Sequence, residues 1–155
     1  MISKEVWNNV IVPGGEDAEF DWFGIDKNGQ VGAFSTFNRG YIPEIVKSSH
    51  LKYLELLNEI ENLPLKYNAL LLTKEQGSYD DWLEYSQQGF IAFDYGDVNR
   101  TINTGIFDLI SKPENLVTAS ELGIKISLIE RMPKFNLSFY HEIGITEQKL
   151  RNKII

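Results

Sequence analysis

Residues 20–37 read FDWFGIDKNGQVGAFSTF, and this stretch determines the fold class that we expect. Aromatic and β-prone residues stand on both sides of Asn28-Gly29. An Asn-Gly pair between two such runs is the strongest short-range signal of a β-hairpin, because both residues tolerate positive φ. We therefore predict strands at about 20–26 and 30–37, joined by a tight turn.

An amphipathic helix is expected after the hairpin, beginning at Pro43 or Ser49 and ending near Leu63-Pro64. Four apolar side chains recur at three-residue spacing and two more widen the stripe, the pattern of a helix that packs one side on a core. They are Leu51, Tyr53, Leu54, Leu56, Leu57 and Ile60. Residues 65–76 contain four leucines, and their pattern leaves both a short helix and a strand open.

The second half of the chain alternates short helices and strands. Ser78 is expected to cap a helix that Gly89 ends. Strands are expected at 90–95, with a turn at Gly96-Asp97, and at 104–111. A short helix capped by Thr118 or Ser120 follows, and then a strand or strand–helix junction at 124–129. The whole order predicts one α+β domain over residues 1–155, an antiparallel sheet with helices packed on one side.

Composition restricts the partners of this domain. The chain has 155 residues, no Cys and a net charge of −7, with a pI of about 4.8. Such a field repels phosphate backbones, so we expect no direct binding to nucleic acid or to an anionic membrane. The first residues lack the apolar region of a secretory signal, and no apolar run approaches the length of a membrane span. A cytoplasmic location is therefore expected.

The stretch between Glu75 and Val98 carries six carboxylates and no Lys or Arg. Six aromatic rings are interleaved with them: Tyr79, Trp82, Tyr85, Phe90, Phe93 and Tyr95. Tyr and Trp supply rigid contact area and carboxylates attract basic side chains, so we predict a surface that binds a basic protein. Its predicted contacts are Asp80, Asp81, Glu84, Asp94, Tyr95 and Asp97, with Arg39 and Tyr41 as further candidates.

Signals of catalysis are weak. The chain has no G-x-S-x-G motif and only two histidines, and His141-Glu142 does not extend to H-E-x-x-H. We expect that the protein is not an enzyme and that it binds no cofactor or metal. One alternative stays open: the acid pairs Asp80/Glu84 and Asp94/Asp97 could hold Ca²⁺ or Mg²⁺, or could act as a carboxylate- or metal-dependent hydrolase through Glu84, Asp94 or Asp97. A regulatory or scaffold domain is a third possibility.

Parts of the chain resemble a family of small bacterial proteins. Residues 20–34 are similar to their opening motif, and residues 107–113 and 132–135 look like two later segments, about a third of the chain in all. Such proteins resemble immunity partners in bacterial toxin systems, including the SMI1/KNR4-like group. The resemblance implies an immunity protein that occludes a basic toxin, such as a nuclease. The partner's identity and the oligomeric state are left open.

Overall fold

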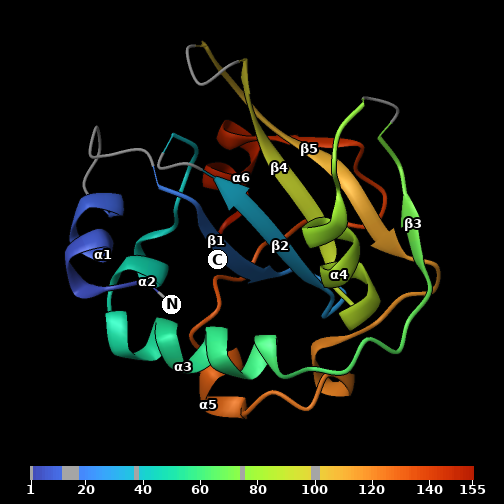
Figure 1. The fold of residues 1–155 in the computed structure, drawn as a ribbon, viewed down its shortest axis with the longest axis horizontal. Coiled ribbons are helices and arrows are strands. Elements are labelled where there is room, and N and C mark those ends of the chain that lie inside the picture. The colour runs from blue at the N-terminus through green and yellow to red at the C-terminus, as the bar shows by residue number, and fades with distance from the viewer. Residues whose placement is uncertain (1, 12–17, 37–38, 74–75, 99–101) are drawn as a thin grey trace.

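The computed structural model describes residues 2–11, 18–36, 39–73, 76–98 and 102–155. Within these ranges it is an α+β fold, as the sequence predicts, with helices packed against a six-stranded sheet (Figure 1). The elements are α1 (Lys4–Val10), β1 (Phe20–Ile25), β2 (Val31–Thr36), α2 (Glu44–Lys47), α3 (His50–Glu61), β3 (Ala69–Leu71), α4 (Asp80–Gln88), β4 (Ile91–Val98), β5 (Ile102–Pro113), η1 (Ala119–Glu121), α5 (Ile126–Ile129), β6 (Gly144–Thr146) and α6 (Glu147–Lys153).

The predicted hairpin is confirmed as β1 and β2. They pair antiparallel, and Gly29 has a φ of 81° at the turn. The Asp26 carboxylate stabilises the turn, since it accepts hydrogen bonds from the backbone N–H groups of Asn28 (2.8 Å) and Gln30 (2.9 Å). Its second oxygen accepts the N–H of Phe139 at 2.9 Å. This buried carboxylate therefore ties the hairpin to a segment more than 100 residues away.

The sheet is mostly antiparallel, as predicted, but it is mixed because one strand pair is parallel. The strand order is β1-β2-β4-β5-β3, with β6 also paired to β5. β2 and β4 run parallel, whereas the remaining pairs are antiparallel. The chain leaves β2, passes through α2, α3, β3 and α4, and returns beside β2 in the same direction. A parallel pair needs such a long crossover, which a hairpin signal does not reveal.

Elements cover both faces of the sheet, so the expectation of helices on one side needs correction. Successive side chains of a strand point to opposite faces. Trp22 lies in one buried cluster with Trp7 of α1 and Leu150 of α6, whereas Phe23 lies in the other with Ile60 of α3. Figure 1 shows α4 in front of the sheet. The central strands are therefore apolar on both sides.

α3 confirms the predicted helix and its Ser49 cap, whose hydroxyl accepts the N–H of Lys52. The buried stripe is formed by Tyr53, Leu56 and Ile60. Leu51, expected in the stripe, is 66% exposed. The helix is rotated so that Tyr53, Leu56 and Ile60 face the core. Leu54 and Leu57 are only partly buried.

Three other expectations are settled by the backbone. Residues 69–71 form a strand, which resolves the open choice at 65–76. The turn predicted at Gly96-Asp97 is wrong, because β4 continues through both residues to Val98. The residue that caps α4 is Tyr79, not Ser78, and its side chain makes no capping bond.

The remaining helix predictions are partly confirmed. Gly89 ends α4 in the left-handed region, as expected. Thr118 is the residue before η1, and residues 126–129 form α5.

Candidate functional site

α4 carries the exposed part of the predicted acidic face. Asp80 and Asp81 lie in its first turn, where carboxylates interact favourably with the helix dipole, and Glu84 follows one turn later. All three side chains are exposed. Among the residues that the structure describes, none of the three forms an ion pair with Lys, Arg or His. Their negative charge is therefore directed to solvent.

Buried hydroxyl groups hold α4 on the sheet. The Ser86 and Ser111 hydroxyl oxygens lie 2.7 Å apart. Ser86 Oγ also lies 3.0 Å from the carbonyl of Phe90, and Ser111 Oγ lies 2.8 Å from the carbonyl of Trp82. Each hydroxyl has one proton to donate, so the two hydroxyl groups share their donors among these three contacts. Because Ser86 is in α4 and Ser111 is in β5, these contacts set the position of the helix, and with it the position of its acids.

A groove of about 250 Å³ lies between α3, α4 and β1. Its apolar part consists of Leu57 and Ile60. Its polar lining comprises Asp21, Glu61, Asp81, Glu84, Tyr85 and Gln88, with no Lys or Arg from the part of the chain that the structure describes. An apolar floor beneath four carboxylates suits a side chain that has an aliphatic stem and a cationic head.

A smaller hollow of about 70 Å³ adjoins this groove, because Asp21 and Asp81 line both. Glu19 and Asp94 add two further carboxylates, and the rest of the lining is Ser35, Thr36 and Trp82. Asp81 and Asp94, which are distant in the sequence, are thereby brought to one hollow. The acidic face extends from α4 across the edge of the hairpin.

Asp21 is a buried carboxyl group of this face whose pKa is shifted. Burial raises its pKa above the ordinary value, and hydrogen bonds from Tyr85 and Ser35 oppose the increase only in part. Nearby Glu19 and Asp81 raise it further. The Tyr85 hydroxyl donates to Asp21 Oδ2, and burial next to this carboxylate raises the pKa of Tyr85 as well. A cation entering the groove would stabilise the ionised form of Asp21.

Three of the six rings interleaved with the acids are directed inward, and one of them, Tyr95, is a predicted contact. Phe90 and Phe93 are fully buried, and Tyr95 is 3% exposed. The Tyr95 hydroxyl contacts Glu147 of α6 and accepts the N–H of Gly105, on the face of the sheet opposite Asp94. Tyr79, Trp82 and Tyr85 are half-buried. The acids and rings that were predicted to share one face are therefore separated. The rings that remain partly exposed beside the acids are in α4 or just before it.

The other predicted contacts lie apart from this face. Asp97 pairs with Asn103 near the far end of β4, and its side chain is outside the described residues. Tyr41 packs on the opposite face, where its ring lies 4.3 Å from the Arg151 guanidinium. Arg39 precedes it, half-buried, in the segment between β2 and α2.

Sequence reasoning missed Asp21, Glu19 and Glu61 as parts of this face. The signal available was the position of Asp21 in an aromatic strand, where a carboxylate is unusual. The period-two alternation of residues 93–95 also indicated that Asp94 and Tyr95 point to opposite faces.

The structure adds two observations on other functional classes. In the described ranges, no three His, Cys, Asp or Glu side chains gather closely enough to hold a metal ion. Of the two histidines, His50 Nε2 contacts the carbonyl of Ile2 at 2.8 Å, and His141 is exposed. The hydrolase alternative is not tested by these contacts and stays a prediction.

None of the helices among the described residues is long and apolar enough to cross a bilayer. Comparisons with protein-family models, curated proteins and solved structures give no match. The resemblance of residues 20–34 to bacterial immunity proteins therefore stays a prediction.

Proposed function

We propose that this protein is a non-enzymatic binding domain whose acidic face docks on a basic protein. The observation that carries the proposal is the groove between α3 and α4, which four carboxylates line together with Leu57 and Ile60, and which no Lys or Arg of the described residues lines. The face comprises Asp21, Glu61, Asp80, Asp81 and Glu84, extended by Glu19 and Asp94.

The groove suits Arg or Lys of a partner better than a neutral group. The methylene stem of such a side chain buries apolar surface against Leu57 and Ile60, and its charged head meets Glu61, Asp81 and Glu84. Arg is the better occupant, because its planar guanidinium forms paired hydrogen bonds with carboxylates. Charges at the rim chiefly raise the association rate, whereas the inserted side chain sets the dissociation rate.

The partner that fits best is a basic toxin such as a nuclease, and the mechanism is occlusion. Enzymes that act on nucleic acid present a basic surface to phosphate groups. A protein of net charge −7 with an acidic groove competes for that surface and denies access to the substrate. This assignment agrees with the immunity-protein resemblance of the sequence.

The test is capture of a partner from cognate cells by the wild-type protein and by the double variant Asp80→Lys/Asp81→Lys. Both residues are exposed, so the variant is expected to fold. We expect loss of the captured protein, and we expect added salt to weaken capture by the wild type.

A matched control reverses two exposed acids elsewhere, Glu121→Lys/Glu130→Lys, and is expected to capture the partner normally. Equal capture by both double variants, without dependence on salt, would contradict the assigned face. A captured protein with an acidic interface would contradict the partner class.

A further inference from the structure

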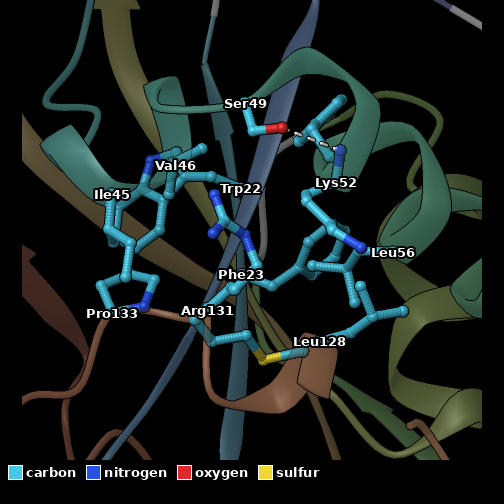
Figure 2. Close-up of a pocket in the computed structure, with 12 residues that line it drawn as sticks. Trp22, Phe23, Ile45, Val46, Ser49, Lys52, Leu56, Leu128, Arg131 and Pro133 are labelled. Atoms are coloured by element: carbon cyan, nitrogen blue, oxygen red, sulfur yellow. Dashed lines mark hydrogen bonds between the residues drawn. The ribbon is translucent and has the colours of Figure 1, made fainter.

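A small apolar pocket lies between α2, the first half of α3 and the segment that follows α5 (Figure 2). Its volume is about 30 Å³. Most of its apolar lining is buried, including Trp22, Phe23, Leu128 and Met132. The pocket shares no lining residue with the acidic groove or with the hollow beside that groove. It is therefore a separate site.

Two cations stand at the mouth of this pocket. Lys52 and Arg131 are partly exposed, and no Asp or Glu of the described residues belongs to the lining. Figure 2 shows the Arg131 guanidinium in the middle of the lining residues, with Ile45 and Pro133 on one side and Lys52 and Leu56 on the other. In a chain of net charge −7, such a lining favours an anionic occupant.

The Arg131 guanidinium is held in place but lacks an acidic partner. Its Nη2 donates to Ser48 Oγ at 2.8 Å. Across the part of the chain that the structure describes, no carboxylate lies within ion-pair distance of it. A guanidinium has five N–H donors in a geometry that matches a carboxylate. Most of these donors are therefore free to bind a carboxylate that enters the pocket.

The acids that neighbour the pocket in the sequence leave this cation unneutralised. Glu44 pairs with Lys47 at 2.7 Å, and Glu55 pairs with Lys52 at 3.1 Å. Glu130 is exposed and lies outside the lining. Because Lys52 and Glu55 are both well exposed, their ion pair contributes little to stability. Lys52 can exchange Glu55 for an occupant, as a second donor beside Arg131.

An apolar interior with cations at its mouth selects a group whose apolar part enters first. An Asp or Glu side chain carries its charge at the tip, so it would bring the charge into the apolar part. The last residue of a polypeptide carries its side chain and its carboxylate on the same Cα. Since a cavity of about 30 Å³ has room for roughly two water-sized groups, it suits the two methyl groups of Val and excludes the ring of Phe.

We propose that this pocket binds the carboxyl-terminal residue of a partner polypeptide. A small apolar side chain fills the cavity, and the terminal carboxylate binds Arg131 and Lys52. The preceding residues of the partner contact Ile45, which is 38% exposed, and half-buried Val46 at the margin. A free carboxylic acid of the same size lacks this second contact, which favours a polypeptide as the source of the carboxylate.

Titration with the peptide acetyl-Ala-Ala-Ala-Val, followed by NMR, tests the proposal. Trp22 lines the pocket, and its buried indole N–H has no hydrogen-bond partner in the described ranges, so its resonance is a local reporter. We expect the peptide with a free carboxylate to bind about tenfold or more tightly than its C-terminal amide, because hydrogen bonds between charged groups are strong. A peptide that ends in Phe and free isovalerate should both bind more weakly.

Arg131→Gln should reduce the affinity for the carboxylate peptide to that for the amide, without changing the affinity for the amide. Lys134→Gln is the matched control, since it removes an exposed cation outside the lining, and it should bind like the wild type. Equal affinity for carboxylate and amide overturns the proposal, as does an unshifted Trp22 resonance up to about 10 mM peptide.

Isovalerate that binds as tightly as the peptide overturns the assignment to a polypeptide. Equal affinity for the peptide that ends in Phe overturns the placement of the side chain in the cavity. The variant Asp80→Lys/Asp81→Lys should bind the Val peptide normally, because neither residue lines this pocket. Failure of this proposal is therefore distinguishable from failure of the acidic face, which is tested by capture of a basic partner.

Discussion

Asp21 shows how one residue links the fold to the acidic face. It lies in β1 between Phe20 and Trp22, and its backbone carbonyl accepts the Tyr53 hydroxyl at 2.7 Å. Its carboxyl group faces α4, where it accepts a hydrogen bond from Tyr85. The strand thus places a buried carboxyl group in the groove. Because burial raises its pKa, ionisation of Asp21 destabilises the fold, and a cation bound in the groove would reduce this cost.

The variant Asp21→Asn should therefore change how stability depends on pH. The folded-state pKa of Asp21 is raised, so its stabilising contribution is present at low pH and is lost as the pH rises through that pKa. An amide retains an acceptor for Tyr85 without ionising. We expect the variant to gain stability relative to the wild type as the pH increases from about 4 to 7.

Urea unfolding at several pH values measures this difference. A free-energy difference that is constant across the range would show that Asp21 does not titrate differently on folding.

Gly89 is a second residue whose identity matters. Its φ of 113° ends α4, and an added Cβ would lie 2.9 Å from Leu122 Cδ2. We expect Gly89→Ala to cost about 1–3 kcal/mol of unfolding free energy, through backbone strain and this contact. Chemical denaturation measures it.

Gly123→Ala separates the two causes. Gly123 also has a positive φ, but nothing lies within 4 Å of its added Cβ. The Gly123→Ala variant should lose about 1 kcal/mol of unfolding free energy, which is the cost of the backbone conformation alone. Equal losses at both positions would exclude a contribution from the Leu122 contact.

At the scale of elements, α4 depends on polar contacts as much as on apolar packing. Of its residues only Ser86 and Gln88 are fully buried, and both are polar. Gln88 Nε2 donates to the Ile60 carbonyl at 2.8 Å, which joins α4 to α3. Ser86 joins it to β5. The groove between the two helices is therefore kept at a defined width by hydrogen bonds.

Ser86→Ala and Ser111→Ala test this attachment. Each should cost about 1–2 kcal/mol, because a buried carbonyl loses its donor. The double variant should cost less than the sum, since the two hydroxyl groups share one contact. Urea unfolding provides the free energies, and exposed Ser127→Ala is a neutral control. Strict additivity would mean that the hydroxyl groups do not interact.

At the scale of the whole molecule, the acidic face gathers around α4 and extends to β1. Because salt screens exposed charges, binding of a basic partner at this face should depend on ionic strength.

We expect the association rate of a basic partner to fall by about tenfold or more between 50 mM and 500 mM salt, as for other steered complexes. Stopped-flow fluorescence measures this rate. A salt-independent association rate would contradict electrostatic steering.

The sequence by itself determined the elements whose signals are local: the hairpin, because Asn28-Gly29 sets the turn, the Ser49 cap of α3, and the end of α4 at Gly89. It also indicated that Asp80, Asp81 and Glu84 would lie on an acidic surface, and all three are exposed. Only the tertiary structure decided which residues meet. The parallel pairing of β2 with β4 brings Asp94 to Asp81, and β1 delivers Asp21 beneath α4. These contacts depend on long crossovers and strand order, which leave no periodic pattern in the chain.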